Sequence, residues 1–169
     1  MLPASDPAVT HASSWAVQET PNPTVPNGFL VSDSCTSSTK CTAVGRYESS
    51  AGNTLTLAEA WNGTTWRIET TPNPAGATTS LLSAVSCTSA RACTAVGYYY
   101  DSAGDILTLA EAWNGTSWST ETTPNPAGVA GSGLLPLSCT SARACTAAGT
   151  YNNRSGVPVT LAERWSGTS

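Results

Sequence analysis

SCTSARACTA at residues 86–95 is repeated letter for letter at residues 138–147, and LTLAEAWNGT at residues 55–64 is repeated at residues 107–116. Both pairs are 52 residues apart, and a more divergent copy of the first stretch surrounds Cys35 and Cys41. A period near 50 residues that is rich in short β-type runs is typical of the blades of a β-propeller. The repeat therefore predicts an all-β chain that carries three blades.

The middle copy divides into four strands, A to D, at residues 81–87, 92–100, 106–113 and 118–122. Strand A is a short apolar run, and strand B is rich in β-branched and aromatic residues, which favour sheets. Asn114-Gly115 between C and D predicts a type I′ hairpin turn, since both residues tolerate a positive φ. Strand D stops at Pro124 and Pro126, because proline has no N–H for a β-ladder. Each repeat is therefore expected to be a four-stranded antiparallel blade.

The six cysteines form three pairs with a constant spacing of six residues: Cys35 with Cys41, Cys87 with Cys93, and Cys139 with Cys145. A hairpin brings the residues that flank its turn opposite one another, at a distance that a disulfide can span. An even count and regular pairing favour an oxidising compartment. We therefore expect three disulfides within the repeats, in a secreted or cell-surface protein. Reduced structural thiols are the alternative.

The chain begins one strand before the first complete copy of the repeat, and its third copy is one strand short. Residues 15–23 have the sequence of a strand D with its Pro-Asn-Pro exit, and the third copy has strands A to C without D. The expected organisation is a disordered N-terminal arm at residues 1–14, strand D at 15–23, blade 1 at 24–74, blade 2 at 75–126 and blade 3 at 127–169.

Three blades are too few for a closed ring, because propellers typically contain four to eight. The N-terminal strand of one chain can instead complete blade 3 of another chain, which is the velcro closure of propellers carried out between copies. We expect a homodimer that closes a six-bladed ring by two-fold symmetry. Three chains with nine blades, or a piece of a longer propeller, are the alternatives.

Composition argues against several classes of function. Charged residues make up 11% of the 169 residues and the net charge is −4, so the sequence has no basic footprint for nucleic acid or an anionic membrane. Residues 1–14 lack the features of a signal peptide, so an export signal is expected to be absent from this chain. The one histidine, His11, falls in the expected arm and supports neither a Ser/His/Asp arrangement nor a zinc site. We expect no enzyme, no cofactor, no metal, and neither nucleic acid nor membrane as partner.

The run SCTSARACTAVG at residues 86–97, followed by LTLAEAWNGTSW at 107–118 and TPNP at 123–126, resembles repeats of secreted, mostly uncharacterised actinobacterial proteins. The resemblance covers the chain from Trp15 onward and implies a β-propeller. Similarity to the highly symmetric propeller lectins is architectural only, because no lectin binding motif matches residue by residue.

Three kinds of residue are candidates for binding a ligand. Tryptophans bracket the Asn-Gly turn in the first two copies, and Trp165 with Trp15 is expected to supply the third pair across the junction between copies. Such rings stack on sugars, although cross-strand packing is the alternative. One glutamate per copy lies on the large face of strand C; its alternative role is to accept hydrogen bonds from a neighbouring blade. A tyrosine and an aspartate at the loop after strand B could hold a saccharide or calcium. The candidates are Trp15, Trp61, Trp66, Trp113, Trp118, Trp165, Glu59, Glu111, Glu163, Tyr99 and Asp101.

The function expected from these features is that of an extracellular binding module, with multivalent, lectin-like recognition of carbohydrate. Repeating a weak site once per blade yields avidity. The alternative is a structural or protein-interaction scaffold without a small-molecule ligand, in which all repeated residues serve packing.

Overall fold

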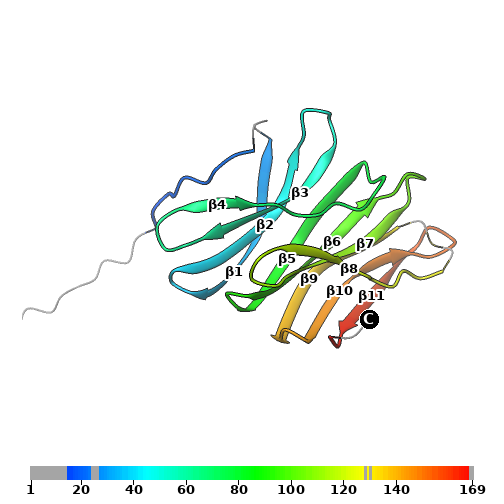
Figure 1. Ribbon diagram of the computed structural model, residues 1–169. Helices are drawn as coiled ribbons and strands as arrows, with labels where there is room; N and C mark the ends of the chain where they lie inside the picture. The colour runs from blue at the N-terminus through cyan, green and yellow to red at the C-terminus, as the bar shows by residue number, and fades with distance from the viewer. Residues whose placement is uncertain (1–14, 24–26, 128, 130, 168–169) are drawn as a thin grey trace, which may run out of the picture.

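The structure of the chain is a computed structural model that describes residues 15–23, 27–127, 129 and 131–167. The expected N-terminal arm at residues 1–14, with His11, lies outside the described residues. Within them the protein is all-β, with eleven strands in two sheets and no helix (Figure 1). None of the described segments is a helix of the length and apolar character needed to cross a membrane.

Each copy of the sequence repeat forms one antiparallel set of strands. Repeat 1 contains β1 (Gly28–Ser37), β2 (Lys40–Glu48), β3 (Thr54–Trp61) and β4 (Trp66–Glu69). Repeat 2 contains β5 (Thr79–Ser89), β6 (Ala92–Tyr100), β7 (Ile106–Trp113) and β8 (Trp118–Glu121). Repeat 3 contains β9 (Ser132–Ser141), β10 (Ala144–Asn152) and β11 (Pro158–Trp165). In all three repeats consecutive strands pair with each other in chain order.

The repeats stand side by side and are joined by little backbone pairing. Repeats 1 and 2 form the eight-stranded sheet through a single parallel pair, Thr54 with Thr79, and the equivalent pair between repeats 2 and 3 is Ile106 with Gly131. The sheets of the single chain do not close or curl into a propeller (Figure 1). Side-chain packing between repeats, rather than a continuous ladder, therefore holds them together.

The N-terminal segment, residues 15–23, does not form the expected strand within the single chain. It has no ladder partner among the described residues, and Trp15 and Val17 are fully exposed. The segment nevertheless lies beside β4, where the indole N–H of Trp66 donates to Gln18 Oε1 at 3.2 Å (Figure 1). It is held in place by repeat 1 without being part of a sheet.

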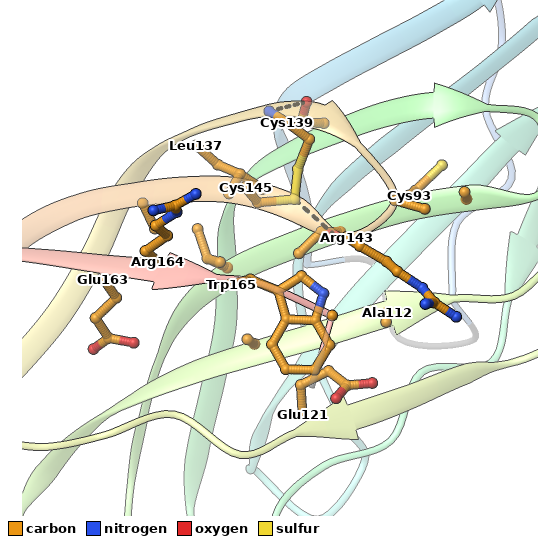
Figure 2. A pocket seen from close by; sticks show the side chains of 18 of the residues that line it. Cys93, Ala112, Glu121, Leu137, Cys139, Arg143, Cys145, Glu163, Arg164 and Trp165 are labelled. Atoms are coloured by element: carbon orange, nitrogen blue, oxygen red, sulfur yellow. Dashed lines mark hydrogen bonds between the residues drawn. A yellow bond between two sulfur atoms is a disulfide. The ribbon is translucent and has the colours of Figure 1, made fainter. Parts of the chain in front are cut away.

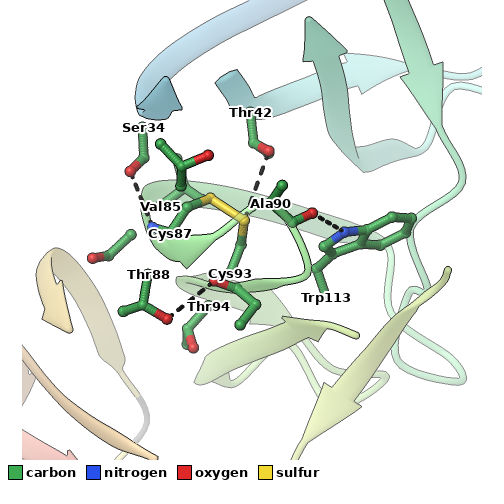
Figure 3. Close-up of a disulfide and its surroundings, with 12 residues drawn as sticks. Ser34, Thr42, Val85, Cys87, Thr88, Ala90, Cys93, Thr94 and Trp113 are labelled. Atoms are coloured by element: carbon green, nitrogen blue, oxygen red, sulfur yellow. Dashed lines mark hydrogen bonds between the residues drawn. A yellow bond between two sulfur atoms is a disulfide. The ribbon is translucent and has the colours of Figure 1, made fainter. Parts of the chain in front are cut away.

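The three expected disulfides are present, and each links facing residues of the first hairpin of a repeat. Their Cα atoms lie 3.9 to 4.0 Å apart in the pairs Cys35–Cys41, Cys87–Cys93 and Cys139–Cys145. Figure 3 shows the second disulfide in contact with repeat 1, where Ser34 Oγ accepts from the backbone N–H of Cys87 at 3.0 Å and Thr42 Oγ1 lies 3.7 Å from Cys93 Sγ. The disulfide hairpins therefore also contribute to the contact between repeats.

The first strand of each repeat carries a β-bulge, which the sequence did not reveal. The register of β5 shifts between Leu82 and Ala84, opposite Gly97 of β6, and equivalent shifts occur in repeats 1 and 3. A Cβ atom at Gly97 would overlap the carbonyl oxygen of Leu81. The glycine of each second strand is thus required because the bulged backbone approaches it so closely.

The turn at Asn114-Gly115 is not the expected type I′ hairpin. Gly115 has a φ of 95°, but no asparagine adopts a positive φ, and four residues separate Trp113 from Trp118. Instead Asn114 Oδ1 accepts from the backbone N–H groups of Thr116 and Ser117, at 2.9 and 3.0 Å. The asparagine side chain thereby organises a wider turn that keeps its own backbone in the ordinary region.

Two equivalent apolar cores lie between the repeats. The core between repeats 1 and 2 contains Val44, Ala58, Leu82, Val85, Cys93, Ala95, Leu109 and Trp118. The core between repeats 2 and 3 contains Ala84, Val96, Ala110, Leu134 and Ala147, with Leu137 and Leu161 packed against it. The second core repeats Val44, Ala58, Leu82 and Ala95 of the first as Val96, Ala110, Leu134 and Ala147, but among the described residues it holds no tryptophan equivalent to Trp118.

Candidate binding site

Two tryptophan pairs lie at the same place in repeats 1 and 2, at the ends of strands β3/β4 and β7/β8. Trp61 and Trp66 face each other across the strands with ring centroids 5.6 Å apart and planes tilted by 41°. Trp113 and Trp118 repeat this arrangement at 5.8 Å and 40°. The pairs are tilted cross-strand contacts, a geometry that favourable aromatic packing accounts for.

The first tryptophan of each pair is fixed by the disulfide hairpin of its own repeat. Trp61 Nε1 donates to the carbonyl oxygen of Ser38, and Trp113 Nε1 donates to that of Ala90, both at 3.3 Å. Both rings remain partly exposed. Their polar edge is therefore satisfied internally, while part of the ring surface stays open to solvent.

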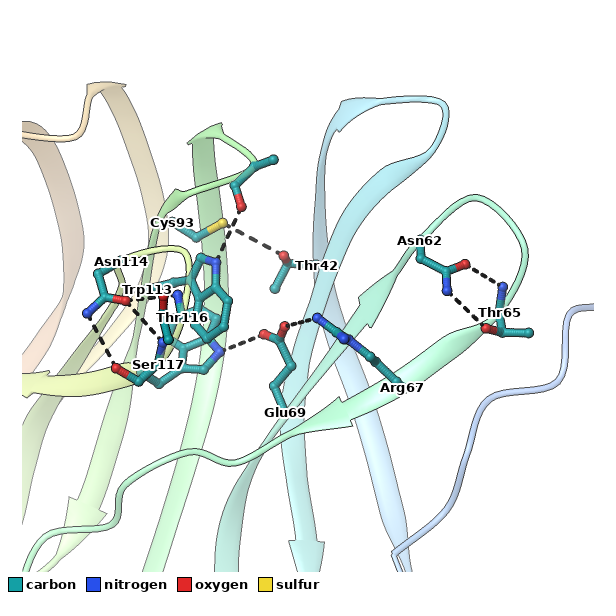
Figure 4. A network of polar contacts seen from close by, with 12 residues as sticks. Thr42, Asn62, Thr65, Arg67, Glu69, Cys93, Trp113, Asn114, Thr116 and Ser117 are labelled. Carbon is teal, nitrogen blue, oxygen red and sulfur yellow. Dashed lines mark hydrogen bonds and ion pairs between the residues drawn. The ribbon is translucent and has the colours of Figure 1, made fainter.

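The second tryptophan of each pair bonds to the repeat before it. Trp118 Nε1 donates to Glu69 Oε2 at 2.9 Å, just as Trp66 donates to Gln18, and Figure 4 shows Glu69 between Arg67 and the turn of repeat 2. Arg67 pairs with Glu69 at 3.7 Å. Trp118 is only 6% exposed and belongs to the core between repeats 1 and 2. Its primary role is packing.

The three glutamates of the third strands lie inside the stack of repeats. Glu59 and Glu111 are buried, and neither oxygen of Glu111 has a hydrogen-bond partner among the described residues. Burial raises the pKa of Glu111 to about 8, with Thr56 of the preceding repeat acting weakly in the opposite direction, and raises the pKa of Glu59 to about 7. Burial also raises the pKa of Glu163, which lies beside Thr108.

Glu59 and Glu111 line neither of the grooves between repeats, whereas Glu163 lines the groove between repeats 2 and 3. The indole N–H groups of Trp66 and Trp118 do not donate to these glutamates. Each donates to the residue three positions after the tryptophan of the preceding outer segment, which is Gln18 for Trp66 and Glu69 for Trp118. The signal for this was present in the sequence, since Gln18, Glu69 and Glu121 occupy the same place relative to their own tryptophans. It was hidden because the partners come from different repeats.

Tyr99 and Asp101 also have structural partners. Tyr99 packs against the core between repeats 1 and 2, and Asp101 Oδ1 accepts from the backbone N–H groups of Ala103 and Asp105 at 2.8 and 3.0 Å. Asp101 therefore closes its own loop. Across the described residues, no group of three or more His, Cys, Asp or Glu side chains converges as a metal site would require.

The best candidate binding site is the pair of grooves between repeats, beside the disulfide hairpins. The first groove, between repeats 1 and 2, is lined by Trp61, Asn62, Glu69, Arg91 and Trp113, among others, and has a volume of about 230 Å³. The second groove, between repeats 2 and 3, is lined by the equivalent residues Trp113, Asn114, Glu121, Arg143 and Trp165. Its volume is about 490 Å³, roughly twice as large.

Figure 2 shows the second groove, with the indole of Trp165 between Glu121 and the Cys139–Cys145 disulfide. Within the described residues Trp165 has no second indole beside it, and Trp15 does not reach it in the single chain. Both grooves thus combine two tryptophans and one amide with carboxylate and guanidinium groups, which are Glu69, Arg67 and Arg91 in the first groove and Glu121, Glu163, Arg143 and Arg164 in the second. No model of a protein family matches the chain, and no curated protein does so either.

Proposed function

We propose that this protein is an extracellular binding module that holds carbohydrate in the grooves between its repeats. One observation carries the proposal: five equivalent side chains line both grooves, namely two tryptophans, an asparagine, a glutamate and an arginine. Aromatic faces stack on the apolar faces of sugar rings, while the amide, carboxylate and guanidinium groups are suited to sugar hydroxyls. A few convergent polar groups beside aromatic walls are typical of small-molecule sites.

The repeat of the groove supports multivalent, lectin-like binding. A single groove of this size contacts little ligand and binds weakly, whereas several grooves with a fixed separation on one assembly gain avidity on a branched or repeated glycan. The three disulfides are consistent with an extracellular protein, because such bonds persist in oxidising compartments.

Closure into a ring belongs to the same proposal. Two copies, each with three repeats, would form a six-bladed propeller, which agrees with the resemblance to actinobacterial propeller repeats. Support comes from the two ends of the stack. Leu30 of repeat 1 is 37% exposed although its equivalents Leu82 and Leu134 are buried, and Ala162 of repeat 3 is exposed although Ala58 and Ala110 are buried. Each end of the stack thus exposes side chains whose equivalents in the other repeats are buried by a neighbouring repeat.

The alternative is a scaffold without a ligand, and the burial of Trp118 favours it. A glycan array on the oligomer tests the choice, followed by titration of the best glycan with two groove variants, Trp61→Ala and Arg91→Ala. We expect each variant to weaken binding at least tenfold. Ile68→Ala is the matched control, since Ile68 is 42% exposed on β4 and outside the groove, and it should bind as the parent does. Binding to no glycan would overturn the proposal in favour of the scaffold.

The ring is tested by mass in solution. Sedimentation equilibrium should give twice the chain mass of 17.3 kDa. A chain that stays monodisperse and monomeric at all concentrations would refute the closure between copies, whereas a trimer would replace six blades with nine.

A further inference from the structure

The larger size of the second groove has an identifiable cause. In the first core Trp118 packs with Val44, Ala58 and Leu82, and the second core repeats these neighbours as Val96, Ala110 and Leu134. The three repeated neighbours line the second groove, and they do not line the first. An apolar socket for an indole is therefore formed between repeats 2 and 3, and none of the described residues fills it.

The N-terminal segment has the sequence that fits this socket. Residues 15–23 align without a gap with residues 66–74 and 118–126, and the tryptophan and the Thr-Pro-Asn-Pro exit are identical in all three segments. The segment also makes the contact with repeat 1 that an outer strand makes with the repeat that follows it. Gln18 accepts a hydrogen bond from the indole N–H of Trp66, as Glu69 accepts one from Trp118. The segment thus already occupies the position of a preceding repeat's outer strand, while the side chain of Trp15 is fully exposed.

We propose that residues 15–23 of a second copy occupy the second groove and pair with the free edge of β11 as its fourth strand. The inference rests on the closure between copies proposed above and names the segment and contacts that produce it. The indole N–H of the second copy's Trp15 donates to Glu121, and its ring completes the third tryptophan pair with Trp165. The segment fills the apolar socket of the second groove, so this groove takes the form of the first only when a second copy binds.

The register of this pairing follows from the two complete repeats. In β3 and β4 the facing residues are Ala58 with Glu69, Ala60 with Arg67, and Trp61 with Trp66. Transferred to the junction, they become Ala162 with Gln18, Arg164 with Ala16, and Trp165 with Trp15. Every one of these six residues is exposed or partly exposed in the single chain.

The N-terminal segment can also form hydrogen bonds at the other end of β11. Thr56 and Thr108 are buried and bonded in the same way: the backbone N–H of each is held by Asn73 or Asn125 Oδ1, at 3.1 and 3.0 Å, and each hydroxyl bonds a threonine at 2.8 Å. The equivalent residue of repeat 3, Thr160, is exposed. The matching acceptors in the N-terminal segment are Asn22 and Thr20. The same segment therefore satisfies both ends of the strand.

Cysteine cross-linking tests the register directly. The full chain with Ala16→Cys and Arg164→Cys should form a disulfide-linked species of two or more chains under mild oxidation, seen on a non-reducing gel. Val17→Cys with Arg164→Cys is the matched control, because a shift of one residue turns the side chain to the opposite face of the strand. Equal cross-linking of both pairs, none in either, or a link within one chain would overturn the proposal.

Trp15→Ala provides a second test that does not depend on folding, since Trp15 is fully exposed in the single chain. We expect the variant to weaken self-association at least tenfold in sedimentation velocity, while Val17→Ala leaves it unchanged, because Thr120, the equivalent of Val17 in repeat 2, stays exposed where the repeats pack. If the parent chain is an oligomer and both variants self-associate as strongly as the parent, the proposed contact of residues 15–23 is wrong, whereas the proposed ring is not refuted. If the parent is a monomer, the ring and the junction fail together, and glycan binding is judged separately.

Discussion

The indole N–H of Trp118 donates to the carboxylate of Glu69, 2.9 Å away, across the boundary between repeats 1 and 2. Trp118 belongs to the outer strand β8 and Glu69 to the outer strand β4, so the bond joins the peripheries of two neighbouring sheets. Trp66 makes the equivalent bond to Gln18. An indole N–H bond to the preceding outer segment therefore occurs twice, and in repeat 2 it is combined with burial of the ring.

Truncation of Trp118 should be the more damaging change at this link. We expect Trp118→Ala to lower the free energy of unfolding by about 3–5 kcal/mol, because a buried ring is removed from the core. Glu69→Gln should cost much less, since glutamine already serves as the acceptor at position 18. Urea titration followed by circular dichroism measures both. A loss for Glu69→Gln as large as that for Trp118→Ala would show that the charge, rather than ring burial, holds the repeats.

The buried carboxyl of Glu111 should make the protein less stable as the pH rises. Its pKa is about 8 in the folded state and is close to the ordinary value of 4.5 when the chain unfolds, so the folded form retains a proton that the unfolded form loses. The free energy of unfolding should fall between pH 5 and pH 8, by on the order of a few kcal/mol. Glu111→Gln should flatten this dependence, being close to the parent at pH 5 and more stable at pH 8.

The exposed Glu19 supplies the control for that experiment, and Glu19→Gln should leave the pH profile of the parent unchanged. The profile is measured by denaturant titration at each pH. A parent whose stability rises from pH 5 to pH 8, or a Glu111→Gln profile parallel to it, would contradict a neutral buried carboxyl.

Asn114 is expected to stabilise its turn through its side-chain oxygen. Asn114→Ala removes the acceptor of two backbone N–H groups and should lower the free energy of unfolding by about 1–2 kcal/mol. Asn114→Asp keeps that acceptor and should stay closer to the parent. Thermal unfolding of the two variants decides the matter, and equal destabilisation would assign the role to the amide nitrogen, which lies 3.3 Å from Ser117 Oγ.

Gly97→Ala should be among the most harmful small substitutions. The added Cβ overlaps the Leu81 carbonyl oxygen, which cannot withdraw without breaking the bulge, so we expect a loss of about 3 kcal/mol or more. Gly133→Ala is the comparison, because its Cβ would lie 3.4 Å from Cδ1 of Tyr98, a side chain that can shift. Similar chemical denaturation midpoints for the two variants would argue against a strict need for glycine opposite the bulge.

Much of the local structure could be predicted from the sequence because each strand carries its own signals. Strands 92–100 and 106–113 have the expected bounds, and the three disulfides follow from residues that face each other across a short hairpin. The first strand is longer than expected, at Thr79–Ser89, since its bulge interrupts the alternation on which strand assignment relies.

The interactions between repeats could not be predicted in the same way. The prediction of a type I′ turn was wrong because the side-chain oxygen of Asn114 accepts from two backbone N–H groups and stabilises a wider turn. The Asn-Gly pattern alone does not reveal this side-chain bond. The grooves were missed because their walls come from residues about 50 positions apart, such as Trp61 and Trp113, and a pattern within one repeat does not say which faces meet. Closure depends on the angle between successive repeats, which no residue type encodes.

The exposed edge of β11 and the exposed Leu30 belong to different surfaces at opposite ends of the stack. Contact between copies through these ends is head-to-tail, and contact of this kind stops growing only if the rotation per copy divides a full circle. Otherwise the same contact adds copies without limit and gives a filament. In the assembly that we propose, the pitch from one repeat to the next therefore decides between a ring and a fibre, and a change in a core residue between repeats would shift that balance.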